Sequence, residues 1–171
     1  MMPKKEPSEK WYYDACTLDD RLNTYAEMIN SEHKSYTSHL AIGEACANCL
    51  LKAGKTRDYE LLNLFIDLLK KLRNLGVLEV VGNDGVEVLL SKIKEILPAF
   101  SVTDSIHLAT ALREQCCIFR TIDNDFIGLS KTISKQLSYE SGIANFNISM
   151  MSSKNKDELF HIKKSKRRNM K

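Results

Sequence analysis

Two aspartates of this 171-residue chain end short apolar runs that are typical of buried strands. Asp14 comes directly after residues 11–13 (WYY), and Asp123 ends the segment 117–123 (CIFRTID). In open α/β sheets, sites form outside the carboxyl ends of the strands. The ordinary role of an aspartate after a strand is that of a turn residue. Both carboxylates are nevertheless candidate site residues if more acidic groups lie at equivalent places.

Two more carboxylates are predicted on helices. Asp104 lies in the first turn of a helix whose start Ser101 or Thr103 can cap, and a carboxylate is favoured there by the helix dipole. Glu44 lies within an earlier helix that begins at Ser38, among small and apolar neighbours. Capping or dipole matching is the common role of an aspartate in a first turn, so Asp104 becomes a candidate only together with the others.

Four carboxylates that meet in one cleft repel one another. Two unit charges ~4 Å apart cost about 4 kcal/mol at an effective dielectric constant near 20. A bound cation or bound protons must offset this repulsion. Oxygen ligands select Mg²⁺ or Mn²⁺ over zinc, and such an ion can activate water and stabilise a phosphodiester under attack. The predicted chemistry is therefore metal-assisted hydrolysis of a phosphodiester, with one ion or with two.

The elements that must position these side chains alternate along the chain. Strands are expected at 11–13, 36–37, 77–81, 117–121 and 146–148, and helices at 17–29, 38–51, 57–75, 86–97, 101–112 and 124–137. Thr17 is expected to cap the first helix, and Gly54 and Gly76 are expected to end the second and the third. Strands that alternate with helices predict a parallel sheet covered on both faces. The expected fold class is α/β, with a mainly parallel central sheet.

Composition indicates a single domain outside secretory compartments. The length suits one domain, and 43% hydrophobic residues allow a real core. No apolar run approaches the ~20 residues of a membrane helix, and the polar residues 1–10 are unlike a signal peptide. Five cysteines agree with free thiols, and Cys46 and Cys49 are interpreted as buried helix residues and not as zinc ligands. We therefore expect a cytoplasmic protein with no membrane partner.

Charge divides the chain unevenly. Residues 152–171 contain eight Lys or Arg against two acidic residues, which leaves the remainder mildly acidic despite a net charge of +3. The expected organisation is a flexible lead (1–10), one domain (11–150) and a basic, flexible tail (151–171). The tail residues that could grip phosphates are Lys163, Lys164, Lys166, Arg167 and Arg168. A solvated end, or a nuclear address in a eukaryotic host, explains the same composition equally well.

The late acidic segment resembles the PIN domain, the small metal-dependent nuclease fold. Residues 104–112 (DSIHLATAL) match the pattern D-x-x-H/I-L-A-x-A-L, and residues 121–126 (TIDNDF) match a T-x-D-x-x-F-like ending. Asp14 matches the aspartate that closes the first strand of that family, and Glu44 matches the glutamate of its early helix. The resemblance covers roughly residues 11–148.

This resemblance implies an α/β/α sandwich, a Mg²⁺ or Mn²⁺ site, and ribonuclease chemistry on single-stranded RNA. It implies Asp14, Asp104 and Asp123 as metal ligands, either direct or through water. Glu44 is implied to hold a metal-bound water or to orient the nucleophile. The commonest small bacterial and archaeal members are toxins of toxin–antitoxin pairs (VapC type) and are often dimeric. An antitoxin protein and a second copy of the chain are therefore expected partners beside RNA.

Several neighbouring residues have two interpretations. Thr121 resembles the hydroxyl with which the family supports its site, although packing within a strand explains it equally well. Asp125 is an additional acidic candidate, but capping of the last helix is its ordinary role. Asp19 could face the cleft, although a dipole-matched surface residue is commoner. His107, one turn after Asp104, is interpreted as a packed histidine and not as a ligand.

We interpret the chain as a metal-dependent endoribonuclease, with a toxin role as a further expectation. One alternative is a non-catalytic protein of the same fold that binds nucleic acid or serves as a scaffold. Another is a structure-specific DNA nuclease of this fold. RNA cleavage that depends on the aspartates and on a divalent cation would distinguish the endoribonuclease from the non-catalytic protein. A panel of RNA and DNA substrates would distinguish it from the DNA nuclease.

Overall fold

The computed structural model describes residues 9–19, 21–57, 59–126, 129 and 131–151. Its strands are β1 (Lys10–Tyr13), β2 (Lys34–Ser38), β3 (Leu78–Val81), β4 (Ile118–Thr121) and β5 (Asn147–Met150). Its α-helices are α1 (Ala15–Asp19), α2 (Arg21–Asn30), α3 (His39–Thr56), α4 (Glu60–Asn74), α5 (Glu87–Ile96), α6 (Val102–Arg113) and α7 (Lys131–Ser141), and a short 3₁₀ helix, η1 (Asn124–Phe126), follows β4.

The strands form one sheet in the order β3-β2-β1-β4-β5, with every neighbouring pair parallel. From β1 the chain adds β2 and β3 on one side, and then crosses over to add β4 and β5 on the other side. The strand order therefore reverses between β1 and β4. This is the place where open parallel sheets bind ligands, beyond the carboxyl ends of the strands.

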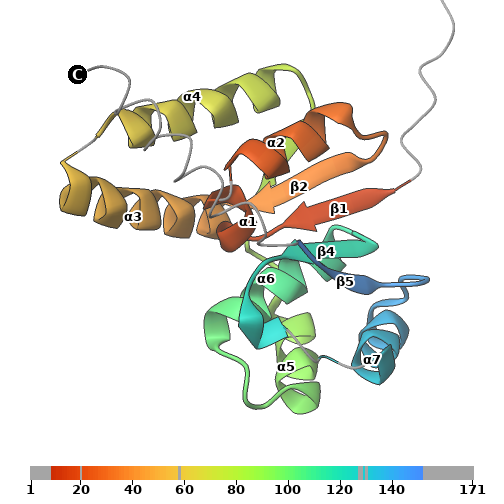
Figure 1. Cartoon of the computed structure of the whole chain (residues 1–171). Helices are drawn as coiled ribbons and strands as arrows, with labels where there is room; N and C mark the ends of the chain where they lie inside the picture. The colour runs from red at the N-terminus through yellow and green to blue at the C-terminus, as the bar shows by residue number, and fades with distance from the viewer. Residues whose placement is uncertain (1–8, 20, 58, 127–128, 130, 152–171) are drawn as a thin grey trace, which may run out of the picture.

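Helices cover both faces of the sheet, as Figure 1 shows, with α2, α3 and α4 on one side and α5, α6 and α7 on the other. Two apolar clusters match these two layers. One joins Tyr13 to Leu18, Cys49, Phe65 and other side chains of α1–α4. The other joins Tyr12 and Phe119 to α5, α6 and α7. The expected three-layer α/β/α sandwich with a parallel sheet is confirmed.

Two adjacent aromatic residues of β1 pack into the apolar clusters on the two faces of the sheet. Side chains alternate across a strand, so Tyr12 and Tyr13 point to opposite faces. Each has no exposed surface and lies in a different apolar cluster. A strand buried on both faces needs consecutive apolar or aromatic residues, which is the pattern that predicted this strand from the sequence. β1 is therefore the central strand both in order and in burial.

The helix starts agree with the sequence at two places and differ at two others. Ser38 and Ser101 cap α3 and α6, because each side-chain oxygen accepts a backbone N–H three residues later, at 3.1 and 3.0 Å. The expected cap at Thr17 is wrong, because α1 begins directly after β1 and Asp14 accepts from the Thr17 N–H at 3.0 Å. The last helix begins at residue 131, not near 124, because residues 124–126 form the separate η1.

The end of α3 was also expected too early. Gly54 was taken as the stop signal, but the helix continues to Thr56 and is closed by Arg57 in the left-handed region, with a φ of 52°. Gly54 is therefore a helix-interior residue, and its missing Cβ serves no turn. Gly76 ends α4 as expected, with a φ of 68°.

Among the helices that the structure describes, none is sufficiently long and apolar to cross a membrane.

The two glycines permit a direct test of these backbone assignments. Gly54→Ala should raise the free energy of unfolding by roughly 0.5–1 kcal/mol, because alanine has the higher helix propensity. Gly76→Ala should lower it by about 1 kcal/mol or more, because its left-handed conformation is strained for any residue with a Cβ. A Cβ at either position meets no atom within 4 Å, so crowding does not complicate the comparison. Urea unfolding of both variants measures the difference, and equal effects would contradict the assignments.

Candidate functional site

Asp14 is the buried centre of the acidic residues predicted from the sequence. Its backbone N–H donates to the Arg120 carbonyl at 3.2 Å, which extends the pairing of β1 with β4 by one residue. Oδ1 accepts the Thr17 N–H at 3.0 Å and so caps α1, while Oδ2 accepts the Thr121 hydroxyl at 2.5 Å. Only 3% of Asp14 is exposed. The two oxygens of this carboxylate therefore have different partners, and one of them caps α1.

Burial makes the Asp14 carboxylate reluctant to ionise. Loss of solvent raises its pKa from the ordinary 3.8 to about 6, although the hydrogen bonds from Thr121 and Thr17 and the nearby charge of His107 act in the opposite direction. A buried carboxylate that is ionised at neutral pH is costly unless a cation lies beside it. Asp14 therefore has the electrostatic character of a group that gains from a bound cation.

Thr121 joins Asp14 to Asp123. Thr121 is the last residue of β4 and is fully buried. While its hydroxyl donates to Asp14, its oxygen accepts the backbone N–H of Asp123 at 3.0 Å. One hydroxyl therefore fixes both the side chain after β1 and the chain direction after β4. The supporting role that the sequence suggested for Thr121 has a matching set of contacts here.

The thiol of Cys16, on α1, contacts one of the predicted carboxylates. It donates to Oδ2 of Asp123 over 3.8 Å. Burial raises the pKa of this thiol to about 12, and the surrounding negative charges add to the effect. Those charges belong to Asp14, Asp123, Glu44 and Asp19. The charges of four carboxylates, which follow β1 and β4 or lie on α3 and α1, thus act on one thiol, and Asp123 contacts it. These residues are up to 109 positions apart in the sequence.

Glu44 is held by a histidine from the opposite layer. Its Oε2 lies 2.7 Å from Nε2 of His107, which is on α6. Nδ1 of the same ring lies 3.0 Å from the Tyr12 hydroxyl, and that hydroxyl lies 2.9 Å from Oγ of Ser38. His107 is almost fully buried, as the sequence suggested, but it is hydrogen-bonded on both nitrogens. Its packing role and a role beside the acidic residues are therefore compatible.

Asp104 is engaged at the start of its own helix. Its carboxylate accepts the Ser101 hydroxyl at 2.6 Å, and its backbone N–H donates back to the Ser101 oxygen at 3.0 Å. This reciprocal pair is a helix cap of the common kind. Asp104 is connected to the other candidates through α6, because His107 lies one turn further along the same helix. Among the described residues, the structure gives Asp104 no direct contact with Asp14, Glu44 or Asp123.

The remaining acidic candidates have structural partners. Asp19 pairs with the ammonium of Lys52 and accepts a hydrogen bond from the Cys49 thiol at 3.9 Å, so it ties α1 to α3. Asp125 is exposed in η1, and its backbone N–H donates to Oδ1 of Asp123 at 2.9 Å. Asp123 therefore caps η1. The tail candidates Lys163, Lys164, Lys166, Arg167 and Arg168 lie outside the described residues.

The carboxylate oxygens of the predicted ligands suit a hard divalent cation, but they do not form a complete ligand set among the described residues. Asp14 and Asp123 offer carboxylate oxygens at the point where the strand order reverses, and such oxygens suit Mg²⁺ or Mn²⁺. Within the described part of the chain, however, no three or more His, Cys, Asp or Glu side chains form a group that could hold a metal ion. The ligand roles of Asp14, Asp104 and Asp123 accordingly stay predictions.

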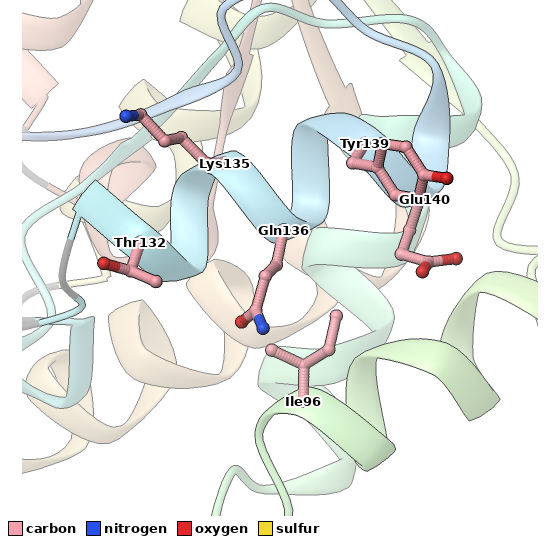
Figure 2. Close-up of a pocket in the computed structure, with 6 residues that line it drawn as sticks. All are labelled: Ile96, Thr132, Lys135, Gln136, Tyr139 and Glu140. Atoms are coloured by element: carbon pink, nitrogen blue, oxygen red, sulfur yellow. The ribbon is translucent and has the colours of Figure 1, made fainter.

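The hollow drawn in Figure 2 lies away from these carboxylates. It encloses about 380 Å³ and is lined by Ile96 at the end of α5 and by residues of α7. The α7 side chains are Thr132, Lys135, Gln136, Tyr139 and Glu140. Tyr139 is 85% exposed, and Glu140 pairs with Lys92 of α5 at 2.8 Å. These are the contacts of a surface groove between two helices, and none of the predicted site residues lines it.

A scan against protein-family models and a search of the curated proteins found no match for this chain. The resemblance to the PIN domain therefore stays a prediction, carried by the motifs of residues 104–112 and 121–126.

Four residues beside the carboxylates were not identified as site residues from the sequence. They are Cys16, Tyr12, Ser38 and His107. Ser38 was recognised only as a helix start and Tyr12 only as part of a strand. His107 had one available signal, since it shares a helical face with Asp104 three residues earlier. None of these contacts is readable in advance, because each joins elements that are distant in the sequence.

Burial of Asp14 predicts a pH-dependent gain in stability for Asp14→Asn without divalent cations. Because the folded-state pKa is raised, the ionised carboxylate costs nothing below about pH 3.8, and the cost is complete above about pH 6. A shift of roughly two pH units corresponds to at most about 3 kcal/mol. The free energy of unfolding of Asp14→Asn, measured in chelator, should therefore exceed that of the wild type at pH 7.5 but not at pH 4.

The matched control is Asp67→Asn, the same change on the exposed side of α4. Its free energy of unfolding should stay within about 0.5 kcal/mol of the wild type at both pH values. An Asp14→Asn variant that is less stable than the wild type at pH 7.5 would contradict the electrostatic account of this site.

Proposed function

We propose that the protein is a Mg²⁺- or Mn²⁺-dependent endoribonuclease that hydrolyses phosphodiester bonds in single-stranded RNA. The observation that carries the proposal is the Thr121 hydroxyl, which bonds to the Asp14 carboxylate and to the Asp123 N–H and so holds the two aspartates together. They meet where the strand order of a parallel sheet reverses, which is the usual position of a site in such sheets. The choice of RNA over other phosphodiesters comes from the resemblance of residues 104–112 and 121–126 to the PIN domain.

In this proposal the acidic side chains have distinct tasks. Asp14, Asp123 and Asp104 hold the cation, and Asp14 is kept in place by Thr121 and by the Thr17 N–H. The cation offsets the negative charge of the scissile phosphate and of the carboxylates themselves. Glu44 orients the attacking water and can accept its proton, a task that suits a carboxylate that is 36% exposed. Thr121 aligns Asp14 and Asp123 through its two hydrogen bonds.

Asp104 must turn away from Ser101 to join a shared cation. The Ser101 hydroxyl and the Asp104 carboxylate form a local pair at the partly exposed start of α6. A contact of that kind is weak enough for a divalent cation to replace it, since it contributes about 1–3 kcal/mol. Loading of the site is therefore expected to order Asp104 last, with water bridging it to the cation where the distance is too long for direct contact.

A non-catalytic role is the second candidate, and two observations favour it. Glu44 and Asp104 already accept hydrogen bonds from His107 and Ser101. In the ranges that the structure describes, no cluster of three metal-binding side chains is formed. In this alternative the fold binds nucleic acid or serves as a scaffold, and its carboxylates are caps and interhelical contacts. RNA binding would then persist in Asp14→Asn and Asp104→Asn, and neither these variants nor the wild type would cleave the RNA.

Cleavage of a labelled single-stranded RNA by the full chain tests the proposal. With Mn²⁺ or Mg²⁺ the wild type should cut, and a chelator should stop it. Asp14→Asn and Asp104→Asn should each reduce kcat/KM on the order of 10³-fold, since each weakens the hold on a cation that contributes several kcal/mol in the transition state. Asp67→Asn controls for the loss of one negative charge and should cut like the wild type.

The substrate panel distinguishes the nucleases. Single-stranded RNA should be cut in preference to single-stranded, duplex and flap DNA, and preference for a DNA flap would favour a structure-specific DNA nuclease. Cleavage that survives both aspartate substitutions, or that survives chelation, would overturn the metal mechanism.

A further inference from the structure

A buried chain of hydrogen bonds runs from the end of β2 to the acidic residues. Ser38, Tyr12 and His107 are joined by contacts of 2.9 and 3.0 Å, and the chain ends on Oε2 of Glu44 at 2.7 Å. Ser38 and Tyr12 have no exposed surface, and His107 is 3% exposed. The Glu44 side chain, in contrast, is 36% exposed. A polar chain of this kind connects a rigid interior to one carboxylate at the surface.

Two arrangements of the protons satisfy the contacts of both ring nitrogens of His107. In one arrangement the Tyr12 hydroxyl donates to Ser38, and a doubly protonated His107 donates from Nδ1 to Tyr12 and from Nε2 to Glu44. In the other, Ser38 donates to Tyr12, Tyr12 donates to Nδ1, and a neutral His107 donates from Nε2. Ser38 can serve in either, because the Ala41 N–H at 3.1 Å uses only a lone pair of its oxygen. Both arrangements place a proton on Nε2, directed at Glu44.

The remaining tautomer is disfavoured by the same contacts. A neutral His107 with its proton on Nδ1 would turn the lone pair of Nε2 toward a carboxylate oxygen 2.7 Å away. Two acceptors at that distance repel each other. The Tyr12 hydroxyl stays protonated in every arrangement, because burial raises its pKa well above the ordinary range. The direction of the hydrogen bond from His107 to Glu44 is thus independent of the charge on the ring.

This contact restricts a side chain that would otherwise be mobile. A glutamate on a helix surface has several rotatable bonds, and holding it costs side-chain entropy. His107 comes from α6, in the layer opposite to α3, so it fixes Glu44 from outside the glutamate's own helix. His107 is itself held on its other nitrogen by Tyr12, a residue of the central strand. Through His107 and Tyr12, the position of Glu44 is therefore fixed relative to β1, the strand that Asp14 follows.

We propose that His107 is a positioning residue that, supported by Tyr12, holds Oε2 of Glu44 so that Oε1 orients the attacking water. The inference rests on the proposed nuclease function and assigns the residue on which its water-orienting group depends. His107 does not contact the substrate in this account, and it acts only through Glu44. A donor at the position of Nε2 is what the site requires, and not the imidazole as such.

The test compares two amides at position 107. His107→Gln can place an amide N–H near the position of Nε2 but loses the contact of Nδ1 with Tyr12, so kcat should fall about tenfold. His107→Asn reaches only as far as Nδ1 and loses the contact with Glu44, so kcat should fall about 100-fold, with KM for single-stranded RNA unchanged. If His107 served folding alone, both variants would lose stability and activity to a similar extent. Thermal unfolding of each variant measures the loss of stability.

Tyr12→Phe is the second variant, in case the asparagine variant does not fold. It leaves Glu44 and His107 in place but removes the partner of Nδ1, and kcat should fall about tenfold. His33→Asn is the matched control for a tyrosine–histidine contact elsewhere, because Nε2 of His33 lies 2.8 Å from the Tyr13 hydroxyl, which also bonds to Glu27. It should leave kcat at the wild-type value.

Nitrogen-15 NMR of the His107 ring gives a readout that needs no activity. We expect a protonated Nε2 in the metal-free wild type, and Glu44→Gln should shift the signal of that nitrogen. An unprotonated Nε2, or equal kcat for His107→Asn and the wild type, overturns the positioning role while cleavage by the wild type upholds the nuclease. A wild type that cuts no RNA although Nε2 is protonated overturns the nuclease function, and the positioning role with it.

Discussion

One carboxylate lies buried at the point where the parallel sheet reverses its strand order. Asp14 ends the central strand, caps the helix that leaves it, and accepts a hydroxyl from the neighbouring strand β4. These contacts keep it in place, yet burial still raises its pKa to about 6. Hydrogen bonds therefore compensate only part of the lost hydration, and the remaining penalty makes this edge of the sheet a place where positive charge is favourable.

Local structure and chemistry share the same side chains at this edge. The oxygen of Asp14 that caps α1 differs from the oxygen that accepts from Thr121, and Asp123 caps η1 with one oxygen while the other accepts from Cys16. Each carboxylate oxygen can accept more than one hydrogen bond. A capping role therefore does not exclude a role in binding a cation. This is why the ordinary interpretation of each aspartate and the functional one are compatible.

The fold could be predicted from the sequence in its outline and less well at its boundaries. Consecutive aromatics in residues 11–13 predicted a strand, Ser38 marked a helix start correctly, and of the two expected caps of α6 the structure uses Ser101. Gly54 misled, because a glycine inside a helix costs only about 1 kcal/mol and the packing of Ala45, Cys49 and Ala53 carries α3 past it. Thr17 misled as well, because Asp14 already supplied the cap three residues earlier.

Local pattern predicted where several strands end and helices begin, because these features depend on side chains close together in the sequence, and the alternation of strands with helices predicted a parallel sheet. It also singled out Asp14, Glu44, Asp104 and Asp123 by type and position. Only the tertiary structure decided that the Cys16 thiol contacts Asp123, and that His107 bonds to Glu44 while Asp104 bonds to Ser101. The reason is physical: hydrogen bonds between elements are set by how helices from two layers pack on one sheet, and no short stretch of sequence contains that information.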